Sequence, residues 1–269
     1  MTDAAIIPEF APVATGTVFP AMSPSLPSSL LTAATRHYRA AGRFAWHFAR
    51  GKLSMDPMFA GILANGWIPA GARILDLGCG QGLLASLLLA VDEAAAEPGA
   101  WPADWQPPPI GCRVHGLELM PRDVERARAA LAAHQDRALI EQADIARAQF
   151  APSDVVTILD VLHYIPYAAQ EDVLARVYAC LSDGGTLLLR VGDKAGGLPF
   201  RFSNWVDALV FKVRGHASIA MYCRTVAQWQ ALLEQIGFAC EVHPMHAGTP
   251  FASMMLRAVK KPQTLPDGA

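Results

Sequence analysis

A glycine-rich turn carries the residues whose types and spacing most clearly suggest chemistry. In "ILDLGCGQGLL", positions 74–84, Asp76 is followed by Gly78, Gly80 and Gly82, and the turn separates an apolar run from an Ala/Leu-rich stretch. Glycines at a strand-to-helix turn let a ligand approach the backbone closely. The pattern therefore predicts a site for an adenine-containing cofactor.

The turn departs from the dinucleotide fingerprint G-x-G-x-x-G/A. Leu83 stands where that fingerprint has Gly or Ala, which counts against a nicotinamide-dependent oxidoreductase. Asp76, at the tip of the predicted strand, would repel a diphosphate but attract a cofactor that bears an ammonium and a sulfonium group. S-adenosylmethionine has both groups.

The segment "ILDLGCGQG" resembles the first motif of class I S-adenosylmethionine-dependent methyltransferases, an acidic residue followed by G-x-G-x-G. Further motifs of that family follow in order up to about residue 258. The resemblance implies that S-adenosylmethionine is the cofactor. It also implies a cofactor site formed by Asp76, Gly78, Cys79, Gly80, Gly82, Glu118, Leu119, Met120, Asp144, Ile145 and Asp160.

The resemblance assigns roles within this set, with the turn at the methionine half of the cofactor. Glu118, at the end of the second predicted strand, would accept both ribose hydroxyls, because two carboxylate oxygens suit a diol. Leu119 and Met120 would flank the adenine, and Asp144 and Ile145 would meet its amino group and ring. The alternative for each carboxylate is an ordinary helix cap or loop charge.

The end of the fourth predicted strand, "DVLHYIP", supplies candidates for the transfer step. Methyl transfer is an in-line displacement, so the protein must orient the nucleophile, exclude water and remove a proton from an oxygen nucleophile. Asp160 is expected at the methionine end of the cofactor, and His163 and Tyr164 open the following loop. His163 is the predicted base because the ordinary pKa of histidine lies near neutrality; the alternative is that it only shapes the loop.

Two further segments are predicted to complete the site. In "FAWHFARGKL", Lys52 is predicted to meet the cofactor carboxylate, with His47 and Phe48 near the methyl group; the alternative is an ordinary surface lysine. Residues 193–223 follow the fifth predicted strand, at the edge where open α/β sheets bind substrates. The candidate acceptor-binding residues of this segment are Phe200, Arg201, Trp205 and Tyr222. For the three aromatic residues among them, the alternative is ordinary packing.

Alternating apolar and amphipathic stretches must position these residues. Runs such as "RILDL" and "DVVTILDV" alternate with helical periodicity, which indicates a parallel sheet covered on both faces. We expect an α/β, Rossmann-like class I methyltransferase fold with a seven-stranded, mostly parallel sheet. The predicted organisation is a flexible segment 1–28, a helical N-terminal cap 29–71, a methyltransferase domain 72–259 with insertions 91–112 and 193–223, and a flexible tail 260–269.

Composition and charge limit the classes of partner that we expect for this protein. The net charge of −2 favours neither nucleic acid nor an anionic membrane surface. The five cysteines have no metal-ligand spacing, and neither a signal peptide nor an apolar stretch of membrane-spanning length is visible. We therefore expect a cytoplasmic protein with no bound metal, no membrane insertion and a small-molecule acceptor.

The stretches "AGGLPFRFSNWVDALVFKVRGH" and "HAGTPFASMML" resemble methyltransferases that accompany bacterial aryl-polyene and xanthomonadin-type pigment biosynthesis. This second resemblance implies a phenolic or polyketide-like acceptor, free or presented on a carrier protein. Residues 190–224 contain six basic and two acidic residues, a local surplus of +4 that would suit an acidic carrier or a simple solvated surface. A protein or RNA methyltransferase and a non-catalytic S-adenosylmethionine-binding regulator are the remaining alternatives.

Overall fold

The computed structural model describes residues 24–192, 221–245 and 253–261. Its seven-stranded sheet has the order β3-β2-β1-β4-β5-β7-β6. Neighbouring strands among β1 to β5 are parallel, whereas β7 runs antiparallel to both of its neighbours, which confirms the expected mostly parallel sheet. The strands are β1 (Arg73–Leu77), β2 (Arg113–Glu118), β3 (Ala138–Gln142), β4 (Ser153–Leu159), β5 (Leu181–Gly192), β6 (Phe238–Pro244) and β7 (Ser253–Lys260).

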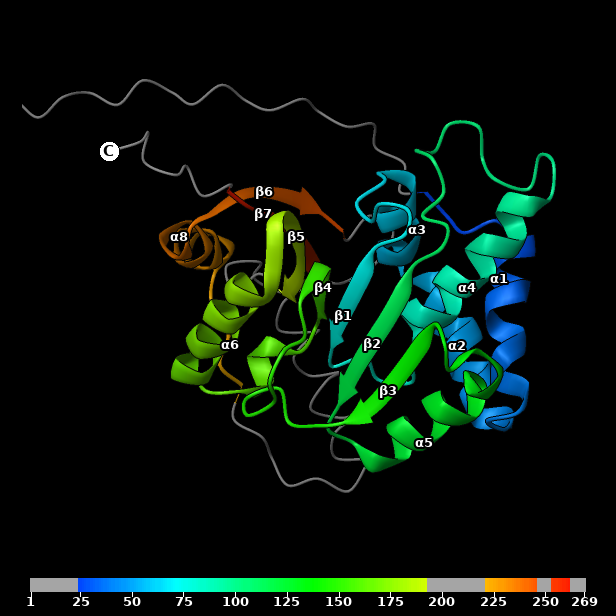
Figure 1. The fold of residues 1–269 in the computed structure, drawn as a ribbon, viewed down its shortest axis with the longest axis horizontal. Coiled ribbons are helices and arrows are strands. Elements are labelled where there is room, and N and C mark those ends of the chain that lie inside the picture. Colours follow the sequence, from blue (N-terminus) through cyan, green and yellow to red (C-terminus); the bar gives the residue numbers. More distant parts are fainter. Residues whose placement is uncertain (1–23, 193–220, 246–252, 262–269) are drawn as a thin grey trace, which may run out of the picture.

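Helices cover both faces of this sheet (Figure 1). The α-helices are α1 (Ser28–Arg36), α2 (Arg43–Met55), α3 (Pro57–Ala64), α4 (Leu83–Ala96), α5 (Pro121–Ala130), α6 (Tyr167–Cys180) and α8 (Val226–Ile236). Short 3-10 helices are η1 (His37–Arg39), η2 (Ala132–His134) and η3 (Leu162–Tyr164). The first three α-helices form the expected N-terminal cap, which packs with α4 and α5 on one face, while α6 and α8 lie on the other.

Strand alternation divides the core into two layers. In β1, Ile74 packs in the layer of the cap and α4, whereas Leu75 and Leu77 pack in the layer of α6 and α8. Adjacent residues of a strand point to opposite faces, so an apolar run such as "RILDL" serves both layers at once. Each fully buried leucine contributes about 1.5–3 kcal/mol of burial free energy.

Local signals define the ends of the helices. Thr225 accepts from the backbone N–H of Gln228, whose side chain accepts from the Thr225 N–H in return, so α8 begins with a capping box. Gly237 ends α8 in the left-handed region at φ 119°. At α3, Asp56 accepts from the N–H of Met58. The caps leave these helices in fixed positions against the sheet.

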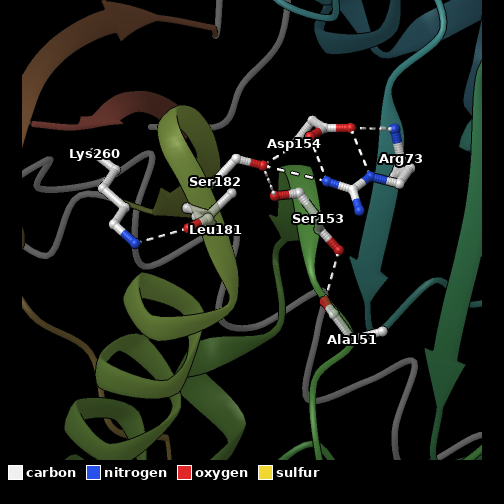
Figure 2. Close-up of polar contacts among 7 residues, drawn as sticks. All are labelled: Arg73, Ala151, Ser153, Asp154, Leu181, Ser182 and Lys260. Atoms are coloured by element: carbon white, nitrogen blue, oxygen red, sulfur yellow. Dashed lines mark hydrogen bonds and ion pairs between the residues drawn. The ribbon is translucent and has the colours of Figure 1, made fainter. Parts of the chain in front are cut away.

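A polar clamp joins four strands at the amino edge of the sheet (Figure 2). Arg73 of β1 donates to both carboxylate oxygens of Asp154 in β4, at 3.0 and 2.8 Å, and Ser182 of β5 donates to Asp154 at 2.7 Å. Lys260 of β7 donates to the carbonyl of Leu181 at 2.8 Å. The hydrogen bonds from Arg73 hold the pKa of Asp154 well below its usual range. The clamp fixes the edge opposite the glycine turn.

Three predicted boundaries require correction. Insertion 91–112 is helical at its start, because α4 continues to Ala96 through good helix formers and stops before Pro98 and Gly99. Lys260, placed in the predicted tail 260–269, is buried and ends β7. The cap begins at Ser28, within the predicted flexible segment 1–28. No helix in the described ranges has both the length and the apolarity to cross a bilayer.

Candidate active site at the carboxyl edge of the sheet

The glycine turn joins β1 to α4 and is held against β2. The backbone N–H groups of Gly78 and Cys79 both donate to the carbonyl of Leu117, at 2.8 and 3.1 Å. All three glycines of the motif have positive φ, 76° at Gly78, 56° at Gly80 and 74° at Gly82. Such backbone angles disfavour other residues, and together the three positions give the turn its sharp path.

Two of these glycines face different surroundings. A Cβ at Gly78 would lie 2.4 Å from Cγ2 of Val161, so this glycine allows the turn to pack against the loop after β4. A Cβ at Gly80 would meet nothing within 4 Å. The open side at Gly80 is therefore where a bound molecule has room to approach the backbone.

The N-terminal cap supports this turn from beneath, a contact that the sequence did not reveal. The hydroxyl of Tyr38, in η1, donates to the carbonyl of Gln81 at 2.8 Å, and both residues are buried. The Gln81 amide in turn donates to Asp123 at the start of α5, at 3.2 Å. The turn is thereby fixed to the cap on one side and to α5 on the other.

Two buried carboxylates flank the turn. Asp76 of β1 is 3% exposed and accepts from the hydroxyl of Thr157 in β4 at 2.7 Å. Burial, with a smaller contribution from the nearby charge of Glu118, raises the pKa of Asp76 to about 6. Burial likewise raises the pKa of Glu118. The structure thus brings together two of the predicted cofactor residues and leaves a concentration of negative charge that favours a cationic ligand.

Glu118 is also oriented by the backbone. One carboxylate oxygen accepts from the N–H of Gly80 at 2.9 Å, and the other accepts from the N–H of Met120 at 2.8 Å. A carboxylate oxygen accepts more than one hydrogen bond, so both oxygens keep acceptor capacity for a diol. The geometry of Glu118 fits the role predicted for it towards the ribose.

The predicted adenine-binding residues have mixed surroundings. Leu119 is 57% exposed beside β2, so an apolar face lies open there. Ile145 is buried in the core. Asp144 accepts from the N–H of Ala146 at 2.9 Å and lies 3.8 Å from Arg147, so it caps its own turn. Asp144 therefore caps the turn that follows it, which was the alternative given for this residue. Its role towards the adenine stays a prediction.

Asp160, at the end of β4, belongs to a chain of alternating charges. Its backbone has φ 61°, unusual for a residue other than glycine, and its carboxylate lies 3.1 Å from Nη1 of Arg190 in β5. The same Nη1 donates to Asp56, at the junction of α2 and α3, and Asp56 also pairs with Lys52 at 2.8 Å. Lys52 is therefore paired with Asp56, and its predicted contact with the cofactor carboxylate stays a prediction.

This charge chain ties the cap to the carboxyl edge. The side chain of Arg190 is 4% exposed and that of Asp56 is 7% exposed, so the pair is buried. Arg190 and Lys52 together lower the pKa of Asp56, although burial opposes them. Sequence reasoning missed Arg190 and Asp56, but the i,i+4 spacing of Lys52 and Asp56 on a helix was a usable signal.

The loop of His163 meets the described end of the predicted acceptor insertion, residues 221–223, which is here called the returning chain. His163 and Tyr164 lie in η3 with ring centroids 3.9 Å apart, and the backbone N–H of Tyr222 donates to the carbonyl of His163 at 2.9 Å. Burial lowers the pKa of His163, partly opposed by Asp160. The structure thus joins a predicted base to a predicted acceptor-binding residue across about 60 residues of sequence.

The other candidates are not placed. Phe200, Arg201 and Trp205 lie outside the described residues, as does most of the insertion 193–223. Among the residues that are described, no cluster of His, Cys, Asp or Glu has the arrangement of a metal site. Cys79 is a buried residue of the turn, and burial raises the pKa of its thiol; its predicted place in the cofactor site stays a prediction.

Comparison with known proteins agrees with the predicted methyltransferase. A family model described as a methyltransferase domain matches residues 45–243. The chain is 28% identical over 131 residues to a carboxy-S-adenosyl-L-methionine synthase of Chromohalobacter salexigens, covering 48% of this chain and 43% of that protein. It is 33% identical over 125 residues to a ubiquinone biosynthesis O-methyltransferase of Xanthomonas campestris pv. campestris, covering 44% and 42%. The matched segment spans less than half of each of these relatives.

Solved structures share the fold at lower sequence identity. Magnesium protoporphyrin IX methyltransferase from Synechocystis PCC 6803, solved with bound SAH, superposes with a TM-score of 0.54 and 19% identity. The match covers 84% of this chain and 94% of that one. The Rossmann-like fold expected of class I methyltransferases is thereby confirmed.

Proposed function

The chain belongs to the methyltransferase domain family, and on that basis we propose that it transfers a methyl group from S-adenosylmethionine to a small phenolic or polyketide-like acceptor. One observation carries the proposal. At the carboxyl edge of β1 and β2, the buried carboxylates of Asp76 and Glu118 surround a glycine turn that is open at Gly80. Such a site suits a cofactor with positive charge and a ribose diol far better than a diphosphate.

S-adenosylmethionine, when bound, supplies a methyl group activated by its sulfonium. The residues of this chain hold it: Glu118 accepts from the ribose hydroxyls, the Gly80 backbone leaves room for close approach, and Leu119 offers apolar surface for the adenine. Asp76 places negative charge beside the methionine half. Its position in the sheet is fixed by the hydrogen bond from Thr157.

His163 acts as the base towards the acceptor hydroxyl. Burial lowers its pKa, so at neutral pH the imidazole is unprotonated and has a nitrogen lone pair available for a proton. The backbone carbonyl of His163 is held by Tyr222, which fixes the loop that carries the ring. A base in this position removes the acceptor proton as the new bond forms.

The acceptor class is supported by the aromatic residues of the predicted insertion 193–223 and by the similarity to a ubiquinone biosynthesis O-methyltransferase. The basic surplus over residues 190–224 would favour a carboxylate-bearing acceptor or an acidic carrier protein. A hydroxybenzoate-type acid, free or as a carrier-bound thioester, meets both requirements.

A methyl-transfer screen tests this proposal. Purified protein is incubated with methyl-labelled S-adenosylmethionine and 3- or 4-hydroxybenzoate, each free and as a carrier-bound thioester, and binding of S-adenosylmethionine, S-adenosylhomocysteine and NAD is measured by calorimetry. We expect binding of the first two compounds and label transfer to at least one acceptor. Binding of NAD alone would overturn the cofactor assignment, and binding of S-adenosylmethionine without transfer to any acceptor would overturn the acceptor class.

Matched histidine variants test the base. His163→Gln should lower the transfer rate by about 10²–10⁴-fold while the affinity for S-adenosylmethionine stays the same. The control is His115→Gln, on β2, where the ring pairs with Glu141 at the surface. Equal rates in the two variants would remove His163 from the mechanism.

A further inference from the structure

Gln170, near the start of α6, lies where the η3 loop meets the returning chain. The residue is fully buried, and its amide nitrogen is within hydrogen-bond distance of three backbone carbonyls. These are the carbonyls of Leu162 at 3.0 Å, Ile165 at 3.1 Å and Tyr222 at 2.8 Å. Because an amide nitrogen has two hydrogens, three carbonyls use its donor capacity completely.

The orientation of this amide is fixed from its other end. The Gln170 carbonyl oxygen accepts from Nε of Arg224 at 3.0 Å. A guanidinium only donates, so the oxygen of Gln170 must face Arg224 and the nitrogen must face the three carbonyls. Arg224 is itself held, because it pairs with Glu171 at 2.6 Å and lies over the ring of Tyr167.

The contacts of Gln170 join the two sides of the candidate active site. Leu162 and Ile165 flank the η3 residues His163 and Tyr164, while Tyr222 belongs to the returning chain. The direct link between the two sides is the hydrogen bond from the Tyr222 N–H to the His163 carbonyl. Without the Gln170 amide, the buried carbonyl of Leu162 and the partly buried carbonyls of Ile165 and Tyr222 would lose a donor at this junction, which disfavours the packed arrangement.

We propose that Gln170 is a positioning residue for the methyl-transfer reaction, which holds the His163 loop and Tyr222 in one fixed arrangement. This proposal rests on the proposed function, since it assigns the base to His163. Gln170 does not touch the reacting atoms. Its effect on the rate comes from the geometry of the loop, and misplacement of a reacting group by about 1 Å costs up to about 10²-fold in rate.

Gln170→Leu tests the proposal, with Gln230→Leu on α8 as the same chemical change away from the site. In Gln170→Leu, the Tyr222 amide should exchange with solvent at least about tenfold faster, while the amides of β4 exchange as before. Transfer to the hydroxybenzoate that the wild type methylates should slow by about 10- to 100-fold, with the dissociation constant for S-adenosylmethionine within about twofold of the wild type. Gln230→Leu should change none of these.

Two results would overturn the proposal. One is an unchanged Tyr222 exchange rate in Gln170→Leu; the other is a parallel loss of cofactor affinity and transfer rate, which would mean general damage to the site. If Gln170→Leu does not fold, Arg224→Met leaves Gln170 in place and removes the group that orients its amide, together with the ion pair to Glu171, and it should show the same changes to a smaller extent. Failure of the proposed function is distinct, because it appears in the wild type as absent cofactor binding or transfer, whereas the exchange measurement needs no acceptor.

Discussion

The buried carboxylate of Asp76 should make the free protein less stable as pH rises. In the unfolded chain this carboxyl has its ordinary pKa of 3.8, whereas in the folded protein its pKa is raised to about 6, chiefly by burial. The folded state therefore holds the proton longer than the unfolded state does. Stability attributable to Asp76 falls between about pH 4 and pH 6, and the loss is complete above that range.

The size of the effect follows from the shift. One pKa unit corresponds to 1.36 kcal/mol, so the stability that the protein has lost through Asp76, relative to low pH, is about 1 kcal/mol at pH 4.5 and about 3 kcal/mol at pH 7.5. Asp76→Asn removes this titration and keeps an oxygen to accept from Thr157. The new amide N–H₂ group adds a constant cost of about 1–3 kcal/mol that does not depend on pH if it finds no acceptor.

Urea unfolding at pH 4.5 and 7.5 measures the prediction directly. The free energy of unfolding of Asp76→Asn relative to the wild type should increase by about 2 kcal/mol between the two pH values. Asp136→Asn, which makes the same change at an exposed carboxylate, is the matched control. A pH-independent difference for Asp76→Asn would refute the reasoning about stability. Unchanged affinity of this variant for S-adenosylmethionine would refute the separate assignment of the Asp76 charge to cofactor binding.

Three other perturbations follow from the described contacts. Gly80→Ala should lower the free energy of unfolding by only about 1–2 kcal/mol, the cost of its left-handed backbone, because a Cβ there meets nothing within 4 Å. Calorimetry should nevertheless show at least about tenfold weaker cofactor binding. Arg190→Met should cost about 3–5 kcal/mol in urea unfolding because it leaves Asp56 buried without its main partner; a loss below about 1 kcal/mol would contradict this. The pKa of His37 is lowered to about 4, so between about pH 6.5 and pH 4 its imidazole binds a proton in the unfolded chain before it does in the folded protein, and the stability attributable to His37 should fall as pH drops through that range. In thermal melts, the stability of His37→Gln relative to the wild type should therefore rise as pH drops, since glutamine keeps a donor for Ser86 without titrating; a difference that does not change with pH would exclude His37 as the source.

The fold was predictable because its strands are buried on both faces. Runs such as β1 and β4 are apolar almost throughout, which separates them from amphipathic helices, and Thr225 and Gly237 mark the ends of α8. The start of β5 was not predictable in the same way. "SDGG" at 182–185 reads as a turn, yet Leu181 already pairs with Ser153, and the register shifts between Ser153 and Val155. β5 advances from Leu181 to Thr186 while β4 advances only from Ser153 to Val155, so the turn-forming residues are accommodated as an irregularity within the strand.

The residues of the candidate site could be predicted from the sequence where they lie in short contiguous motifs. Those that join the site through tertiary contacts could not. The glycine turn, Glu118 and the loop at His163 occur in short motifs at strand ends. Gln170 and Arg190 occur in no motif, because their partners lie 52 and 134 residues away. Side-chain contacts of such sequence separation leave no periodic signal in a single sequence.

The contacts of the cap indicate that it is part of the site and not merely attached to it. Tyr38 holds the glycine turn from the β1 side, and Asp56 holds Arg190, and through it Asp160, at the tips of β4 and β5. Both contacts are buried, so moving the cap would leave unpaired polar groups on each side of the turn. The position of the cap therefore sets the position of the residues that are predicted to flank the cofactor, and the ion pairs that run from Lys52 through Asp56 and Arg190 to Asp160 carry this coupling.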